Sequence, residues 1–244
     1  MPLVLTFFVG IIAGIMSGIV GAGAGLLTAP FFIFIGLPPQ VAVATTKFGA
    51  VGLDLGALVR LRRSKEIVWQ HVAPLLIISV VAAFAGSKLL LEIDEHLIER
   101  LVGFIILAHI PLILLKKDAG VEQKNVSRAR KIVGFVLYFI ILSLQAAFGA
   151  GLGTLLLFVM IFCFGFTFIE SNATKRIPGF VTASIALLIY MFNNVVHYTF
   201  GIAMLLGMTF GGYLGTHLAI KKGNVWVKAI LIAVLIAFGV KLLF

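Results

Sequence analysis

Long apolar segments separated by short polar connections run through the whole chain. A helix needs about 20 apolar residues to cross a hydrocarbon core of about 30 Å, and most of the later segments in each half reach that length. The pattern therefore predicts an all-α polytopic membrane protein. The apolar segments cover residues 3–20, 25–36, 40–60, 68–91 and 97–115, and then 131–148, 153–166, 168–192, 196–219 and 224–244.

The second segment is too short to span. As a helix, residues 25–36 would extend only about 18 Å, so this arm is expected to begin or end near the bilayer centre. It follows the sequence Gly-Ala-Gly-Ala-Gly at residues 21–25. Alternate residues of a helix point about 200° apart, so these glycines cannot share one packing face. Close helix packing is one interpretation, but it suits Gly10, Gly14 and Gly18 better. The other is a helix break within the membrane.

The glycine cluster recurs in the second half. A shift of 128 positions aligns residues 149–153 (Gly-Ala-Gly-Leu-Gly) with residues 21–25, and Thr174-Lys175 with Thr46-Lys47. We therefore divide the chain into a first transmembrane repeat at 1–115, a linker at 116–130 and a second repeat at 131–244. Each repeat is predicted to hold about five helical segments.

The composition of the chain indicates a membrane environment, and the distribution of its charges indicates which side of the membrane each connection faces. With 61% hydrophobic and 11% charged residues the chain cannot be a soluble domain, so its net charge of +10 does not indicate nucleic-acid binding. Basic residues concentrate in the connections at 60–65, 116–131 and 221–228, while those at 92–96 and 193–194 are acidic or neutral. The positive-inside rule then predicts a cytoplasmic linker, with both termini outside.

Matched connections of the two halves carry opposite charge signals, which predicts inverted-topology repeats. Each short segment then forms a hairpin with the helix before it, and the two glycine tips meet near the midplane, as in transporters with broken helices. Broken backbone within a bilayer is tolerated where it lines a polar cavity, and helix N-termini there suit an anion. The predicted anion-binding residues are Gly21, Gly23, Gly25, Thr46, Lys47, Gly149, Gly151, Gly153, Thr174, Lys175 and Arg176.

The charged residues among these also admit simpler explanations. Lys47 could snorkel to the interface, and Lys175 and Arg176 could mark a cytoplasmic helix start. A Thr-Lys pair at one register in both halves favours a shared site instead. Asp54 lies seven residues after Lys47 and is interpreted as its neutralising partner, with proton coupling as the alternative. Glu170 could pair with Lys175 or cap a helix.

Segment 14–52, with its glycine break, Pro30 and Ala44-Thr45-Thr46, resembles the TauE/SafE sulfite exporter family of bacterial and archaeal permeases. The resemblance extends over the whole chain. It implies transport of sulfite, sulfonates or other sulfur oxyanions. Phe158 stands where the second half would match Pro30, so the second hairpin is expected to be straighter.

We expect a permease of the cell (inner) membrane that exports sulfite, a small organosulfonate or a related sulfur oxyanion. An anion channel and an importer of the same anions are the alternatives. The partners expected are the anion and the bilayer, with a homo-oligomer left open. No catalytic constellation or metal-ligand spacing is present, and the single cysteine, Cys163, offers no thiolate cluster, so we expect neither an enzyme nor a cofactor.

Overall fold

The computed structural model describes residues 2–21, 24–94, 120–149 and 152–243, and every regular element in this part is a helix. The predicted segment 97–115, linker residues 116–119, and Gly23 and Gly151 lie outside the described residues. The helices are α1 (Pro2–Val20), α2 (Ala24–Phe34), α3 (Pro39–Leu61), α4 (Trp69–Glu92), α6 (Arg128–Phe148), α7 (Gly153–Val159), the π-helical turn η2 (Met160–Phe164), α8 (Phe168–Thr174), α9 (Arg176–Phe192), α10 (Tyr198–Lys222) and α11 (Asn224–Leu243).

These boundaries lie close to the predicted segments, with one additional break. The predicted segment 168–192 is divided at Lys175 into α8 and α9. Pro178 gives the physical reason, because its ring nitrogen has no hydrogen to donate to the carbonyl of Thr174 and its ring crowds that carbonyl. The break puts Lys175 on a turn between two helices.

The outer surface is suited to lipid. Among the described residues, six helical spans are long and apolar enough to cross a membrane: α1, α3, α4, α6, α8 with α9, and α10. Large apolar side chains stand exposed on these helices, including Ile77 at 70% and Phe192 at 83%. In water such a surface would aggregate, whereas a bilayer covers it. The protein is a multi-pass membrane protein.

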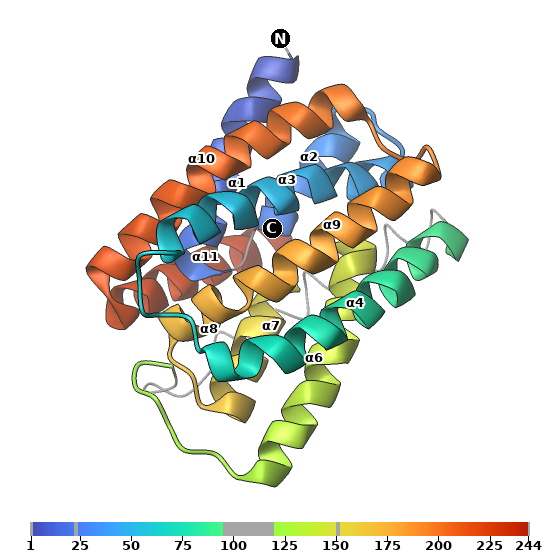
Figure 1. The fold of residues 1–244 in the computed structure, drawn as a ribbon. Helices are drawn as coiled ribbons and strands as arrows, with labels where there is room; N and C mark the ends of the chain where they lie inside the picture. Colours follow the sequence, from blue (N-terminus) through green and yellow to red (C-terminus); the bar gives the residue numbers. More distant parts are fainter. Residues whose placement is uncertain (1, 22–23, 95–119, 150–151, 244) are drawn as a thin grey trace.

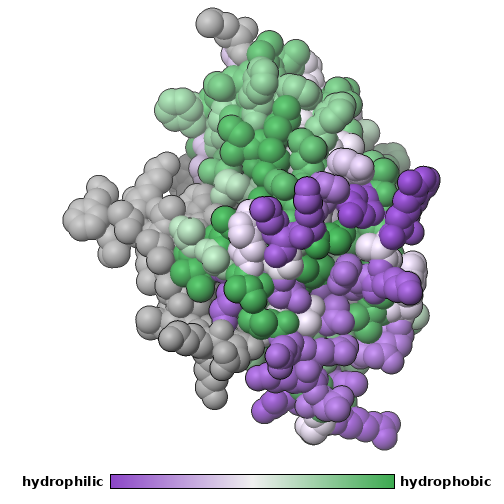
Figure 2. All heavy atoms as spheres, turned by 90° about the vertical axis from the view of Figure 1, so that its left-hand side faces the viewer, coloured by the Kyte–Doolittle hydropathy of each residue, from purple (hydrophilic) through white to green (hydrophobic). Residues whose placement is uncertain are grey.

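Hydrophilic side chains gather over one part of the face drawn in Figure 2, and hydrophobic ones cover much of the remainder. Exposed cations lie at one end of the molecule, in or beside three connections: α3 to α4, the stretch before α6, and α10 to α11 (Figure 1). The exposed cations are Arg62, Arg63, Lys65, Lys124, Arg128, Arg130, Lys221 and Lys222.

Glycines bring α1 and α10 into backbone contact. A methyl group on Gly14 would lie 2.9 Å from the Cα of Gly211, and one on Gly18 would lie 2.8 Å from the Cα of Gly215. Small residues at four-residue spacing allow two helices to approach this closely. The packing interpretation of Gly14 and Gly18 is therefore confirmed.

The long helices form a row in which each contacts the next: α1, α10, α3, α9, α4 and α6. At the centre of the row, α3 and α9 lie side by side and run in opposite directions (Figure 1). The short arms α2 and α7 pack on α1 and α6, the helices that precede them. The helices that flank the breaks also contact the central pair, since α2 contacts α3 and α6 contacts α9.

Candidate functional site

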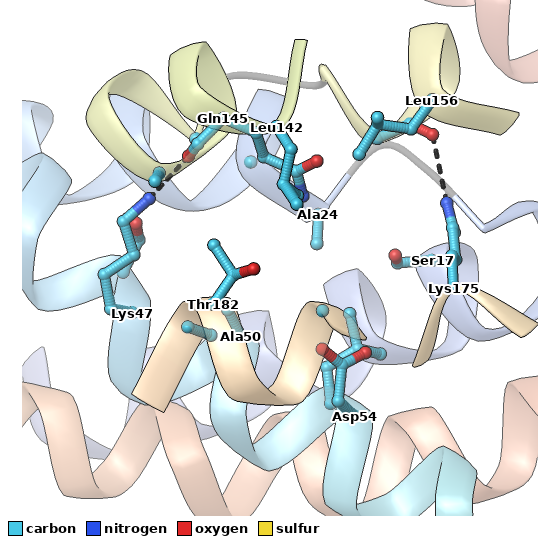
Figure 3. Close-up of a pocket in the computed structure, with 18 of the residues that line it drawn as sticks. Ser17, Ala24, Lys47, Ala50, Asp54, Leu142, Gln145, Leu156, Lys175 and Thr182 are labelled. Atoms are coloured by element: carbon cyan, nitrogen blue, oxygen red, sulfur yellow. Dashed lines mark hydrogen bonds between the residues drawn. The ribbon is translucent and has the colours of Figure 1, made fainter. Parts of the chain in front are cut away.

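A cavity of about 110 Å³ lies where the two helix breaks meet α3 and α9. Figure 3 shows Lys47 and Lys175 at opposite ends of it, with Leu142 and Gln145 on one side and Thr182 on the other. Its polar lining comes from α1, α2, α3, α6, the α8–α9 turn and α9. The lining residues with polar or charged side chains are Ser17, Thr28, Thr46, Lys47, Asp54, Tyr138, Gln145, Lys175, Arg176 and Thr182.

Lys47 is buried at this cavity, with 4% of its surface exposed. Its Nζ donates a hydrogen bond to the carbonyl oxygen of Gln145 at 2.7 Å, in the last turn of α6. The snorkelling interpretation is wrong, because the ammonium group lies inside the protein. Thr46 also lines the cavity, but its hydroxyl donates to the carbonyl of Val43 at 2.6 Å, so its hydrogen is used within α3.

Lys175 takes the corresponding position at the other end. It is 8% exposed, and its Nζ donates to the carbonyl oxygens of Gly21 and of Gly153, the latter at 3.0 Å. Gly21 follows the end of α1, as Gly149 follows the end of α6. Each lysine therefore binds carbonyl oxygens at a helix break, where a cation also meets the partial negative charge of a helix C-terminus.

Gly21 and Gly149, the first residue of each break, share a backbone φ and a hydrogen-bond pattern. Gly21 and Gly149 each have φ of +71°, and each N–H donates back four residues, to Ser17 at 2.9 Å and to Gln145 at 3.0 Å. A side chain is strained at such a φ, which explains glycine at these two positions. The predicted glycines within the described residues all line the cavity: Gly21, Gly25, Gly149 and Gly153.

Arg176 forms an ion pair with Asp54. The Nη1 of Arg176 lies 3.0 Å from Oδ1 of Asp54, and both side chains are almost fully buried. Its Nη2 donates to the carbonyl of Ser17 at 2.6 Å and to Oδ1 of Asn172 at 2.7 Å. The guanidinium therefore links α1, α3 and α8.

The expected pairing of Asp54 with Lys47 is wrong. Seven residues bring two side chains to nearly the same helical face, but about 10 Å apart along the axis. Arg176 comes from the neighbouring helix at the level of Asp54, whereas Lys47 binds the end of α6. The cavity thus carries one cation–carboxylate pair and two lysines that have only backbone partners among the described residues.

Thr174 does not line the cavity, in contrast to its predicted contact with an anion. Its hydroxyl accepts the N–H of Val68 at 3.0 Å, in the connection before α4. Successive helical residues point about 100° apart, so Thr174 and Lys175 face different neighbours. Glu170 does not bind Lys175 either: it caps α8, with Oε2 accepting the N–H of Thr167 at 2.9 Å.

Tyr138 and Asn172 are among the residues at or near the cavity that the sequence analysis did not predict. Tyr138 of α6 lines the cavity with no exposed surface, and Asn172 holds Arg176 and donates to the carbonyl of Gly18 at 2.8 Å. An isolated tyrosine within an apolar segment gives little signal in a single sequence. Within the described residues, no group of three His, Cys, Asp or Glu side chains could hold a metal ion.

Comparison with known proteins then identifies the family. Residues 6–242 match the family described as sulfite exporter TauE/SafE. The chain belongs to this family. A relative in Haemophilus influenzae, named "Probable membrane transporter protein", is 23% identical over 94% of this chain and 90% of its own length. The Escherichia coli "Probable membrane transporter protein YfcA" is 24% identical over 100% of this chain and 91% of its own.

An archaeal relative, "Probable membrane transporter protein MJ0441" of Methanocaldococcus jannaschii, is 30% identical over 63% of this chain and 59% of its own length. No solved structure matches the chain. The protein is therefore a membrane transporter of the TauE/SafE family, and nothing in these relatives indicates catalysis.

Proposed function

We propose that this TauE/SafE protein exports sulfite, a small organosulfonate or a related sulfur oxyanion across the cell membrane, and that the cavity is its binding site. The observation that carries the proposal is the presence of two buried lysines, Lys47 and Lys175, at the helix breaks. Buried ammonium groups are costly unless charge or hydrogen bonds compensate them, and a bound anion supplies both. Their carbonyl partners supply hydrogen bonds but no formal charge.

The cavity volume restricts the size of the anion. At about 110 Å³ it is smaller than the cavity of about 150 Å³ that holds one benzene molecule. A compact oxyanion with three or four oxygens fits such a space, and a short organosulfonate would fill it. The name of the family supports this chemical class.

The row of helices supports two inverted repeats, residues 1–115 and 131–244, joined by the linker 116–130. The 128-residue shift relates α1 to α6, α3 to the α8–α9 span and α10 to α4. The contact order is α1, α10, α3, α9, α4, α6. If each helix is replaced by the other member of its pair, the result is the same order read from the opposite end. The antiparallel course of α3 and α9 agrees with an inversion of topology.

We propose further that the basic connections face the cytoplasm and that both termini lie outside, in accordance with the positive-inside rule. A cysteine introduced at Gln123, an exposed residue, tests this in a Cys163→Ala background. It is expected to resist an impermeant thiol reagent added to intact cells and to react after the membrane is opened. A cysteine at exposed Asn194 is the control and should react in intact cells. The opposite labelling result would show that the basic connections face outside, contrary to the proposal.

Transport itself is tested with the purified protein in liposomes. Sulfite and methanesulfonate are expected to move in a saturable manner, at rates far below those of a channel, and chloride much less. An imposed potential alone should drive the anion toward the positive side, because one elementary charge gains about 2.3 kcal/mol per 100 mV. Flux that fails to saturate would favour a channel. Flux that requires a proton or sodium gradient would contradict uncoupled export.

A further inference from the structure

The hydroxyl of Tyr138 lacks a hydrogen-bond partner among the described residues. Tyr138 lies on α6 with 0% of its surface exposed, and its Oη is buried with nothing to bind. The residue lines the central cavity. Buried hydroxyl groups nearly always have a partner, because an unpaired one keeps the full cost of its removal from water. The Tyr138 hydroxyl therefore needs a hydrogen-bond acceptor, and the described residues do not provide one.

A second buried tyrosine shows how the fold satisfies such a group. Tyr190 of α9 is also 0% exposed, but its Oη donates to the carbonyl of Ala146 at 2.9 Å. Ala146 lies on α6, two turns after Tyr138. The same helix thus provides an acceptor for one tyrosine, while the other remains without a partner beside the cavity.

Other unpaired polar atoms occur around the same cavity. Oε1 of Gln145 and Nε of Arg176 are buried without partners, and both residues line the space that Tyr138 lines. Gln145 follows Tyr138 by seven residues, so the two lie on nearly the same face of α6. Oε1 of Gln145 is an acceptor, whereas Tyr138 and Arg176 contribute the donors that an oxygen-rich anion requires.

We infer that the Tyr138 hydroxyl donates a hydrogen bond to an oxygen of the transported oxyanion. This inference rests on the proposed function and adds an uncharged ligand to the two lysines. It also makes the site unequal at its two ends. The 128-residue shift relates Tyr138 to Gly10, which packs against Met204 and Gly207 of α10. The first half therefore has no hydroxyl at the matching position, and the bound anion has a preferred orientation.

The test compares Tyr138→Phe with Tyr190→Phe in the full-length purified protein, by sulfite and methanesulfonate titration and by thermal unfolding without anion. Tyr138→Phe is expected to weaken binding of sulfite roughly 10- to 100-fold, the effect of a hydrogen bond to a charged group. Its anion-free Tm should stay the same or rise, because the change removes an unpaired hydroxyl. Tyr190→Phe should lower the anion-free Tm and leave binding within about twofold, because it removes a paired hydroxyl.

The outcomes separate this inference from the proposed function. If the unmodified protein binds neither sulfite nor methanesulfonate, the proposed function fails and the role of Tyr138 fails with it. If the unmodified protein binds and Tyr138→Phe binds equally well, only the role of Tyr138 is refuted. A lower anion-free Tm in Tyr138→Phe, matching that of Tyr190→Phe, would show a structural hydroxyl and overturn the inference as well.

Discussion

Asp54→Asn and Arg176→Gln are each expected to destabilise the protein by about 3–5 kcal/mol, because each leaves a buried charge without its partner. The two groups lie 3.0 Å apart with almost no exposed surface. The double variant should recover much of this loss, since it removes both charges. Arg176 also donates to Ser17 and Asn172, so recovery will be incomplete. Chemical unfolding in detergent measures the four stabilities as a double-mutant cycle.

An exposed ion pair supplies the control. Lys88 and Glu92 lie 3.6 Å apart on α4, with side chains 76% and 66% exposed, and their removal should change stability by at most about 1 kcal/mol. If the Asp54 and Arg176 variants behaved like this surface pair, the two charges would not depend on each other. Because Asp54→Asn alone leaves Arg176 uncompensated, its flux cannot by itself report on proton coupling, and the double variant is the appropriate comparison.

Lys47→Ala and Lys175→Ala are each expected to weaken sulfite binding by about 1–3 kcal/mol, the contribution of a charge-assisted hydrogen bond. Both changes also remove donors from carbonyl groups at the helix breaks. Lys175 has two such carbonyl partners and Lys47 has one, so Lys175→Ala should cost more stability than Lys47→Ala. Titration with sulfite gives the affinities, and unfolding gives the stabilities.

Lys65→Ala is the matched control for a lost positive charge, because Lys65 is exposed in the connection after α3. It should bind sulfite as the unmodified protein does. Unchanged affinity in both Lys47→Ala and Lys175→Ala, with folding intact, would remove the lysines from the proposed site. The two lysines would then serve only to bind the carbonyl groups at the ends of the broken helices.

The sequence predicts most of the described helices and the two glycine breaks, because both depend on local signals. Apolar length sets the spans, and the glycine clusters set the ends of α1 and α6, where Gly21 and Gly149 adopt the same positive φ. Lys47 and Lys175 could be placed near those breaks from the sequence alone. They occupy matching positions in the two halves, and such a match can be seen without knowing any contact between distant residues.

What the sequence could not predict depends on contacts between distant segments. The pairing of Asp54 with Arg176 joins residues 122 positions apart, and it requires the crossing of α3 and α9 to be known. The direction of Thr174 depends on the break that Pro178 introduces. The isolation of the Tyr138 hydroxyl appears only when every neighbouring acceptor has been located.

The glycine contact between α1 and α10 has a mechanical consequence. Side chains that interdigitate can change rotamer and let two helices slide, but Gly14, Gly18, Gly211 and Gly215 have no side chains to rearrange. On its other face α10 meets α3 through Gly52 and Gly56, where an added methyl group would overlap its backbone. A packed core of this kind moves as a unit rather than deforming continuously. The three helices α1, α10 and α3 should therefore travel together, and any opening of the cavity should come from displacement of α4, α6 and α9 against them.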